Sequence, residues 1–237
     1  MHQDITILLL TAASIGFLHT LLGPDHYLPF IVMSRARKWS MFKTAWVTAL
    51  CGLGHVGSSI LLGSIGIAFG IGITKIEFWE GSRGNLAAWL FIAFGLVYFA
   101  WGLYRAFKDK PHTHAHIHSD RSFHTHNHDH IAGHAHIHKE ENITNLTPWV
   151  LFLIFAFGPC EPLIPILMYP AAQSNIWGLI LVTGTFAIIT IATMLAVVLI
   201  SSFGINLLPL GKLEKYTHAI AGAIIFLSGA GILFLGL

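Results

Sequence analysis

Six long apolar segments constrain this chain more than any other feature of its sequence. Each supplies roughly 20 residues, the length that a helix needs to cross the hydrocarbon core of a bilayer. The composition agrees, because 54% of the residues are hydrophobic, only 10% are charged and the mean hydropathy is +0.68. We therefore expect an all-α polytopic membrane protein with six transmembrane helices. The segments cover about residues 5–33, 44–73, 86–106, 148–171, 176–201 and 216–236.

The basic residues between these segments predict the orientation of the chain. Eleven Lys and Arg residues fall in the first, third and fifth loops, and two fall in the second and fourth. Basic residues concentrate in cytoplasmic loops, so we expect the odd loops inside the cell and both termini outside, in a bacterial inner membrane. The eleven are Arg35, Arg37, Lys38, Lys43, Arg105, Lys108, Lys110, Arg121, Lys139, Lys212 and Lys215, and the two are Lys75 and Arg83.

A short motif occurs twice, 135 residues apart. Gly23-Pro24-Asp25-His26-Tyr27-Leu28 in the first segment aligns with Gly158-Pro159-Cys160-Glu161-Pro162-Leu163 in the fourth. Proline has no N–H and breaks a helix, so each half is expected to begin with a broken helix. Three helices in each half give the halves opposite orientations, an arrangement found in transporters. The expected organisation is a three-helix repeat over 1–106, a loop over 107–147 and a second, inverted repeat over 148–237.

The loop over 107–147 is hydrophilic and rich in histidine. Alternating His, Thr, Asp and Asn cannot build an apolar core, so we expect this loop to be disordered and cytoplasmic. Imidazole is a good ligand for Zn, Ni, Cu and Co, and a dense histidine tract therefore predicts metal binding. The candidate ligands are His112, His114, His116, His118, His124, His126, His128, His130, His134, His136 and His138.

The first apolar segment carries ionisable residues at membrane depth. Such groups are costly in a bilayer and usually mark a substrate or ion path. His19 and His26 are seven residues apart, on one face of a continuous helix, and Asp25 precedes His26. Two imidazoles and a carboxylate are a reasonable ligand set for a divalent transition-metal ion.

Other residues are expected to complete this site. His55 is a costly side chain in a glycine-rich segment, and Glu161 is the carboxylate that follows the second Gly-Pro pair. Cys51, Cys160 and Thr190 are further candidates; Cys51 lies four residues before His55, and Thr190 corresponds to His55 at the spacing of 135. For Cys51 the alternative is a plain packing role, and for Thr190 it is a hydrogen bond from the hydroxyl to the carbonyls of its own helix.

At these residues the sequence resembles the nickel/cobalt transporter families, both permeases and efflux proteins. The resemblance rests on His19, Asp25 and His26, on Leu53-Gly54-His55-Val56-Gly57-Ser58, and on the histidine tract. It implies a transporter of nickel or cobalt, with zinc as a further candidate, that works by alternating access. The metal ion would be the cargo, and no prosthetic group is expected. We expect the lipid bilayer and metal ions as partners, no nucleic acid, and no enzymatic activity; a homo-oligomer is left open.

The fourth segment is similar to a different group of proteins. The run from Phe157 to Pro165 resembles the Pro-Cys segments of the membrane thiol-disulfide carriers of cytochrome c maturation. Those carriers use one cysteine in each half, whereas Asp25 stands at the matching place here. A thiol-disulfide electron carrier is therefore an alternative function. Export of a small sulfur-containing anion, as in the sulfite-exporter-like families, is another, although the predicted spans hold no Lys or Arg away from their ends.

Overall fold

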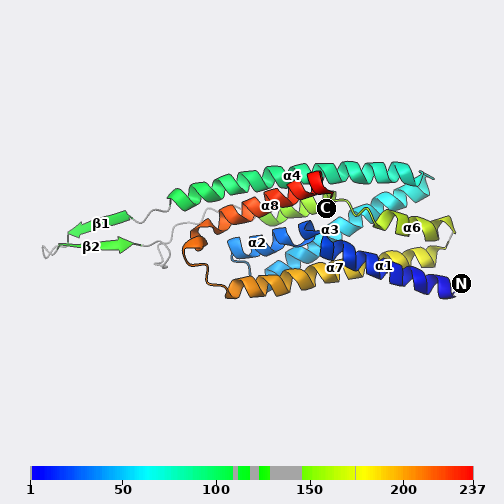
Figure 1. The fold of residues 1–237 in the computed structure, drawn as a ribbon, viewed down its shortest axis with the longest axis horizontal. Helices are drawn as coiled ribbons and strands as arrows, with labels where there is room; N and C mark the ends of the chain where they lie inside the picture. Colours follow the sequence, from blue (N-terminus) through cyan, green and yellow to red (C-terminus); the bar gives the residue numbers. More distant parts are fainter. Residues whose placement is uncertain (1, 109–111, 118–122, 129–145, 174, 237) are drawn as a thin grey trace.

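The computed structural model describes the chain except for residues 1, 109–111, 118–122, 129–145, 174 and 237. The described helices lie side by side in an elongated bundle, and two strands extend beyond one end of it (Figure 1). In chain order the elements are α1 (His2–Leu22), η1 (Pro24–His26), α2 (Leu28–Ala36), α3 (Met41–Ala68), α4 (Ile73–Lys108), β1 (His112–Ile117), β2 (Phe123–His128), α5 (Leu146–Phe157), α6 (Leu163–Ala172), α7 (Ile176–Leu207), η2 (Gly211–Tyr216) and α8 (Thr217–Leu235).

Five of the described helical stretches are long and apolar enough to cross a membrane. The predicted all-α membrane protein is therefore confirmed, but six transmembrane helices in an inverted repeat are not. The predicted fourth span divides into α5 and α6, and the α5 stretch Thr147–Phe157 is shorter than the other candidates. The five are Ile5–Leu22, Met41–Ala68, Ile73–Lys108, Ile176–Leu207 and Leu213–Leu235.

The third predicted segment begins earlier than its apolar residues suggest. α4 starts at Ile73 rather than near residue 86, so the polar stretch before residue 86 is helical. Glu80 and Arg83 lie one turn apart within it, and a short ion pair of 2.7 Å joins them. Paired in this way, these charged residues can continue a helix into the interior of the bundle.

The two halves share their element boundaries at the spacing seen in the sequence. Each of the first three helices of one half has a counterpart 135 residues later: α1 and α5 end at Leu22 and Phe157, α2 and α6 begin at Leu28 and Leu163, and α3 and α7 begin at Met41 and Ile176. The N-terminal caps match as well. The Ser40 side chain accepts a hydrogen bond from the Lys43 N–H, and Asn175 accepts one from the Gly178 N–H. The matching bounds support a repeat, whereas the inverted relation of the halves stays a prediction.

Helices α4 and α8 pack more closely than side chains would allow. A Cβ atom added to Gly95 would collide with the backbone of Phe226, and one added to Gly222 would collide with that of Phe99. Gly102 meets Ala219 in the same way. Small residues allow helix backbones to approach each other in membranes, where apolar burial gives little driving force. The pairs run in opposite directions along the two helices, so α4 and α8 are antiparallel.

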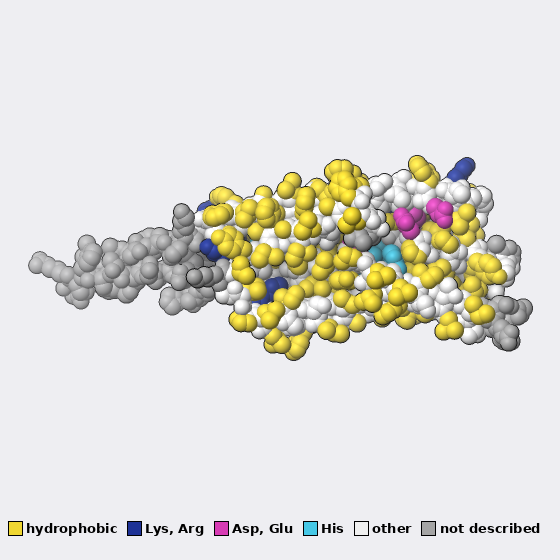
Figure 2. Space-filling model, viewed as in Figure 1, with side chains coloured by type: hydrophobic (Ala, Val, Ile, Leu, Met, Phe, Trp, Pro, Cys, Tyr) yellow, Lys and Arg dark blue, Asp and Glu magenta, His cyan; other side chains and the backbone are white. Residues whose placement is uncertain are grey.

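The flank of the bundle is apolar, as contact with lipid requires. Large side chains such as Phe42, Ile200 and Leu22 are more than 70% exposed. Figure 2 shows hydrophobic side chains over most of the visible face, with several Lys and Arg side chains near the end from which the strands extend. In a soluble protein such a surface would aggregate, whereas a bilayer covers it.

The histidine-rich segment is described only in part. β1 and β2 form an antiparallel pair whose Cα register places His112 opposite His128, His114 opposite His126 and His116 opposite His124. The other candidate ligands of this segment, His118, His130, His134, His136 and His138, lie outside the described residues. That 107–147 is a separate, disordered, metal-binding domain stays a prediction.

Candidate functional site

The first broken helix places two of the predicted residues next to each other. α1 ends where the Gly23 N–H donates to the His19 carbonyl, and Pro24, which has no N–H, begins the short η1 helix. A Cβ atom on Gly23 would lie 2.6 Å from His26 Nδ1 and 2.9 Å from Asp25 Oδ1. A side chain at this position would therefore displace the Asp25 and His26 side chains, which fold back over Gly23.

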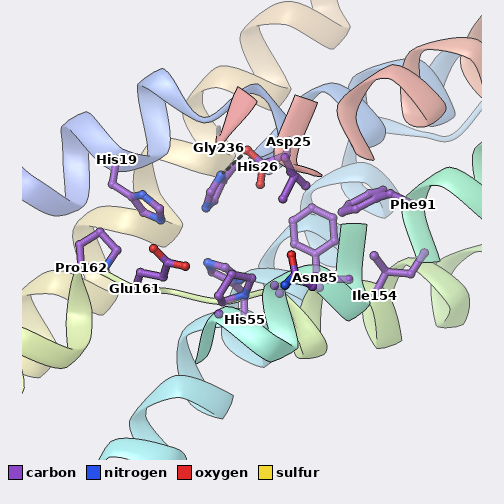
Figure 3. Close-up of a pocket in the computed structure, with 17 residues that line it drawn as sticks. His19, Asp25, His26, His55, Asn85, Phe91, Ile154, Glu161, Pro162 and Gly236 are labelled. Atoms are coloured by element: carbon purple, nitrogen blue, oxygen red, sulfur yellow. Dashed lines mark hydrogen bonds and ion pairs between the residues drawn. The ribbon is translucent and has the colours of Figure 1, made fainter. Parts of the chain in front are cut away.

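Five predicted residues line one cavity of about 270 Å³ between the helices (Figure 3). They are His19, Asp25, His26, His55 and Glu161, and Asn85 and Phe91 of α4 also line it. The structure thus brings these five residues around one cavity. Their roles as metal ligands stay predictions.

Three imidazole rings form the centre of this cavity. The His26 ring lies edge-on between His19 and His55, with ring centroids 4.7 Å and 5.0 Å away. His26 and His55 are almost fully buried, at 3% exposure each. One ring nitrogen from each histidine lies within 4.8 Å of the other two. A cluster of this kind is able to hold a metal ion or to exchange protons.

The second broken helix forms the opposite wall. Gly158, Pro159, Glu161 and Pro162 line the cavity between α5 and α6. A Cβ atom on Gly158 would lie 3.2 Å from His55 Nδ1, so this break contacts the histidine cluster directly. The repeated Gly-Pro motifs therefore face each other across the site, with His55 of α3 between them.

The two cysteines do not line the cavity. Cys160 is fully buried behind the wall, in a hydrophobic cluster that includes Val56 and Phe186. Cys51 is also fully buried, in a separate cluster that includes Met194. Both thiols are free.

Thr190 lies apart from the cavity as well. It is fully buried, and a Cβ atom added to Gly16 of α1 would lie 3.2 Å from its hydroxyl. The 135-residue spacing that relates Thr190 to His55 therefore does not bring Thr190 into this site.

A buried ion pair was missed by the sequence analysis. Glu80 is fully buried, and its carboxylate accepts hydrogen bonds from Arg83, from the Ser59 hydroxyl and from the Cys160 backbone N–H. The Arg83 guanidinium also donates to Ser58 at 2.6 Å and to the carbonyls of Ala156 and Gly158 at 3.0 and 3.3 Å. The pair thus connects α4, α3 and the end of α5.

A sequence signal for this pair existed. Glu80 and Arg83 have the spacing of an ion pair on one helix face, and they directly precede an apolar run. Assigning residues 74–85 to a loop hid that pattern, because the spacing has meaning only on a helix.

The comparisons with known proteins give one family. Residues 28–233 match the family described as cytochrome c biogenesis protein transmembrane region. No curated protein and no solved structure matches the chain.

This family match corrects the functional prediction. The resemblance to nickel/cobalt transporters rested on short motifs, and His19, Asp25 and His26 precede the matched residues. Ionisable residues beside a Gly-Pro break are a local pattern, whereas the family match extends over most of both halves. The prediction of a nickel/cobalt transporter is therefore wrong, and the chain belongs to the cytochrome c biogenesis protein transmembrane region family.

Proposed function

We propose that this protein is a membrane carrier of thiol-disulfide reducing equivalents, with Cys160 and Cys51 as its redox pair. The observation that carries the proposal is the position of Cys160, at a helix break in the membrane and directly behind the wall of the cavity. Family membership supports the same function, since the name of the family refers to cytochrome c biogenesis.

The surroundings of Cys160 suit a thiol that must be held and then released. Its backbone N–H is shared between Ser59 Oγ at 3.2 Å and Glu80 Oε2 at 3.3 Å. Both of its chain neighbours, Pro159 and Glu161, line the cavity. A shift of this segment, in which residues 159 and 160 lie outside the helices, would turn the thiol from the hydrophobic cluster toward the cavity once the hydrogen bonds of the Cys160 backbone with Ser59, Glu80 and Leu163 rearrange.

Both thiols are free, as the reduced form of such a carrier would have them. Cys160 contacts Ser59, which lies eight residues beyond Cys51 and therefore about 12 Å along the α3 axis. A disulfide needs Cα atoms about 4.4–6.8 Å apart, so the oxidised form requires the α5–α6 break to move along α3 toward Cys51.

The electron balance of the cycle is simple. A dithiol protein on one side reduces the Cys51–Cys160 disulfide to two thiols and itself becomes a disulfide. On the other side the two thiols reduce a disulfide acceptor, and the carrier disulfide forms again. Two electrons and two protons pass in each step, by exchange through a mixed disulfide.

Transfer across proteoliposomes tests this function. The full chain is reconstituted with glutathione disulfide enclosed in the vesicles and a reduced thioredoxin-type dithiol outside. We expect reduced glutathione to appear inside with the wild type and to fall to the protein-free background with Cys160→Ser or Cys51→Ser. Thr48→Ser, another conservative change at a fully buried position of α3, is the matched control and should transfer normally.

Two results would overturn the proposal. One is transfer that persists in Cys160→Ser. The other is no transfer by wild-type protein that elutes as a single folded species.

We also propose that the protein sits in a bacterial inner membrane with the odd-numbered loops and the histidine-rich segment in the cytoplasm. The eleven-to-two distribution of basic residues supports this orientation.

A further inference from the structure

Several ring nitrogens of the histidine cluster are left without a hydrogen bond among the described residues. Nε2 of His19, His26 and His55 is buried in each case and has no hydrogen-bond partner among the described residues. A buried polar atom without a partner destabilises a fold by about 1–3 kcal/mol. Three such atoms that converge within one cavity indicate a missing ligand rather than three independent defects.

The His26 ring is oriented so that one of its nitrogens is free to bind. Its Nδ1 lies 3.1 Å from Asp25 Oδ1 and 3.2 Å from the Gly23 carbonyl oxygen, and both of these atoms are acceptors. Nδ1 must therefore carry a hydrogen, and in the neutral ring this leaves the lone pair on Nε2. A histidine that donates Nδ1–H to a carboxylate while Nε2 is bare has the arrangement of a metal ligand with its supporting carboxylate.

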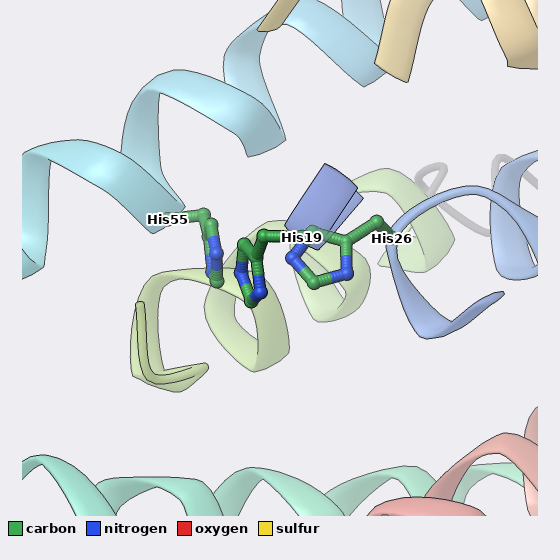
Figure 4. A group of neighbouring side chains, drawn as sticks. All are labelled: His19, His26 and His55. Carbon is green, nitrogen blue, oxygen red and sulfur yellow. The ribbon is translucent and has the colours of Figure 1, made fainter. Parts of the chain in front are cut away.

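The spacing of the rings fits a small metal ion. Ligand nitrogens at the Zn–N distance of about 2.0–2.1 Å lie roughly 3.4 Å apart in a tetrahedral site. Each of the three histidines offers a nitrogen within 4.8 Å of the other two. Side-chain rotations that move each nitrogen by about 1 Å would bring the three to the spacing of a tetrahedral site. Figure 4 shows the three rings next to one another, with His55 on α3 facing the two histidines of the first broken helix.

The charge around the cluster also fits a dication. Three neutral imidazoles add no charge, whereas Asp25 and Glu161 line the same cavity and are both carboxylates. Their two negative charges match a divalent ion, which would otherwise be very costly at membrane depth. The side of the cluster that faces the cavity leaves room for a fourth ligand, either water or the Glu161 carboxylate.

We propose that His19, His26 and His55 hold one resident divalent transition-metal ion of the zinc class, with Asp25 as the supporting carboxylate. The ion stays bound and is not a cargo. It fastens η1 to α3, the helix that also carries Cys51, and it keeps the first break of the chain in place. The site does not depend on the thiol function proposed above, since neither cysteine belongs to it.

Zinc binding by the purified full chain tests the proposal. All eleven histidines of residues 112–138 are changed to Gln in every sample, because that segment would bind zinc by itself. Zinc content after gel filtration is measured by mass spectrometry, and competition with a chelator gives the affinity. We expect one zinc per chain, an affinity at least 100-fold lower in His55→Gln, and an affinity about 10–100-fold lower in Asp25→Ala.

Two controls separate the site from the thiols and from general damage. Cys51→Ser/Cys160→Ser should bind zinc normally while losing transfer of reducing equivalents. Thr190→Ala, a buried change at the corresponding position of the second half, should also bind normally. Zinc should raise the melting temperature of the parent chain but not that of His55→Gln, a readout that does not depend on thiol chemistry.

The proposal is overturned if the parent chain retains no zinc, or if His55→Gln and Asp25→Ala bind zinc as tightly as the parent. Cobalt(II) provides an independent check, because three histidines and one further ligand in a tetrahedral site give strong visible absorption. A weak octahedral spectrum would also overturn the proposal.

Discussion

Glu80 is an acidic side chain with no exposure to solvent, and its ion-pair partner among the described residues is Arg83. Arg83 compensates it at 2.7 Å, and the same guanidinium donates to two carbonyls at the end of α5. Burial without a partner makes a carboxylate strongly unfavourable, whereas loss of both charges is tolerated better.

We therefore expect Arg83→Gln to lower the free energy of unfolding by about 3–5 kcal/mol. Arg83→Gln/Glu80→Gln should be more stable than Arg83→Gln alone, because no uncompensated charge remains. Unfolding in mixed micelles with increasing denaturing detergent measures both variants. Equal or lower stability of the double variant would contradict the idea that the buried charge is the main cost.

The residues around the cavity show what the sequence does and does not predict about single side chains. His19, Asp25, His26, His55 and Glu161 were identified because ionisable side chains are rare in apolar segments, and the structure gathers them around one cavity. Their chemical role did not follow from that rarity, since short motifs of this kind fit several families. Cys160 faces away from the cavity although both of its neighbours line it, and no spacing rule distinguishes these orientations in a non-helical segment.

Among the elements, α4 and α8 form the contact that depends most on glycine. Because the backbones themselves touch, a single methyl group has no space at Gly222. Gly184 of α7 is different, since a Cβ atom there would meet nothing within 4 Å.

Gly222→Ala should therefore destabilise the protein by about 1–3 kcal/mol, the usual effect of overpacking. Gly184→Ala should leave stability unchanged or raise it by up to about 1 kcal/mol, because alanine favours the helix. Thermal unfolding in one detergent compares the two variants directly. A similar loss for both would show that space at the α4–α8 contact is not the deciding factor.

The elements also show the limits of hydropathy. Apolar length predicted the five long helices, but it placed the start of α4 about 13 residues too late, because charged residues that pair inside the bundle look like a loop. Hydropathy likewise merged α5 and α6 into one span. The Gly-Pro motif correctly predicted a break within each of the two segments, since proline removes a backbone donor wherever it occurs.

At the scale of the whole molecule, the predicted orientation is open to a direct test. Lys75, near the start of α4, and Lys215, just before α8, are both exposed. In a chain with Cys51→Ser and Cys160→Ser, single-cysteine variants Lys75→Cys and Lys215→Cys are treated in intact cells with a membrane-impermeant maleimide. We expect labelling of Lys75→Cys only, because basic loops such as that of Lys215 stay in the cytoplasm. Labelling of Lys215→Cys in intact cells would reverse the orientation.

The close contact of α4 with α8 has a mechanical consequence. Sliding one helix along the other would bring the backbone of Phe99 or Phe226, which now faces a glycine, against a larger side chain. We therefore expect α4 and α8 to move as one rigid unit. The break between α5 and α6 is restrained by hydrogen bonds with Arg83 and Glu80 and not by contact between helix backbones. We therefore expect a conformational change of this protein to leave the α4–α8 pair intact and to bend the chain at the α5–α6 break, while the metal ion proposed above keeps the first break in place.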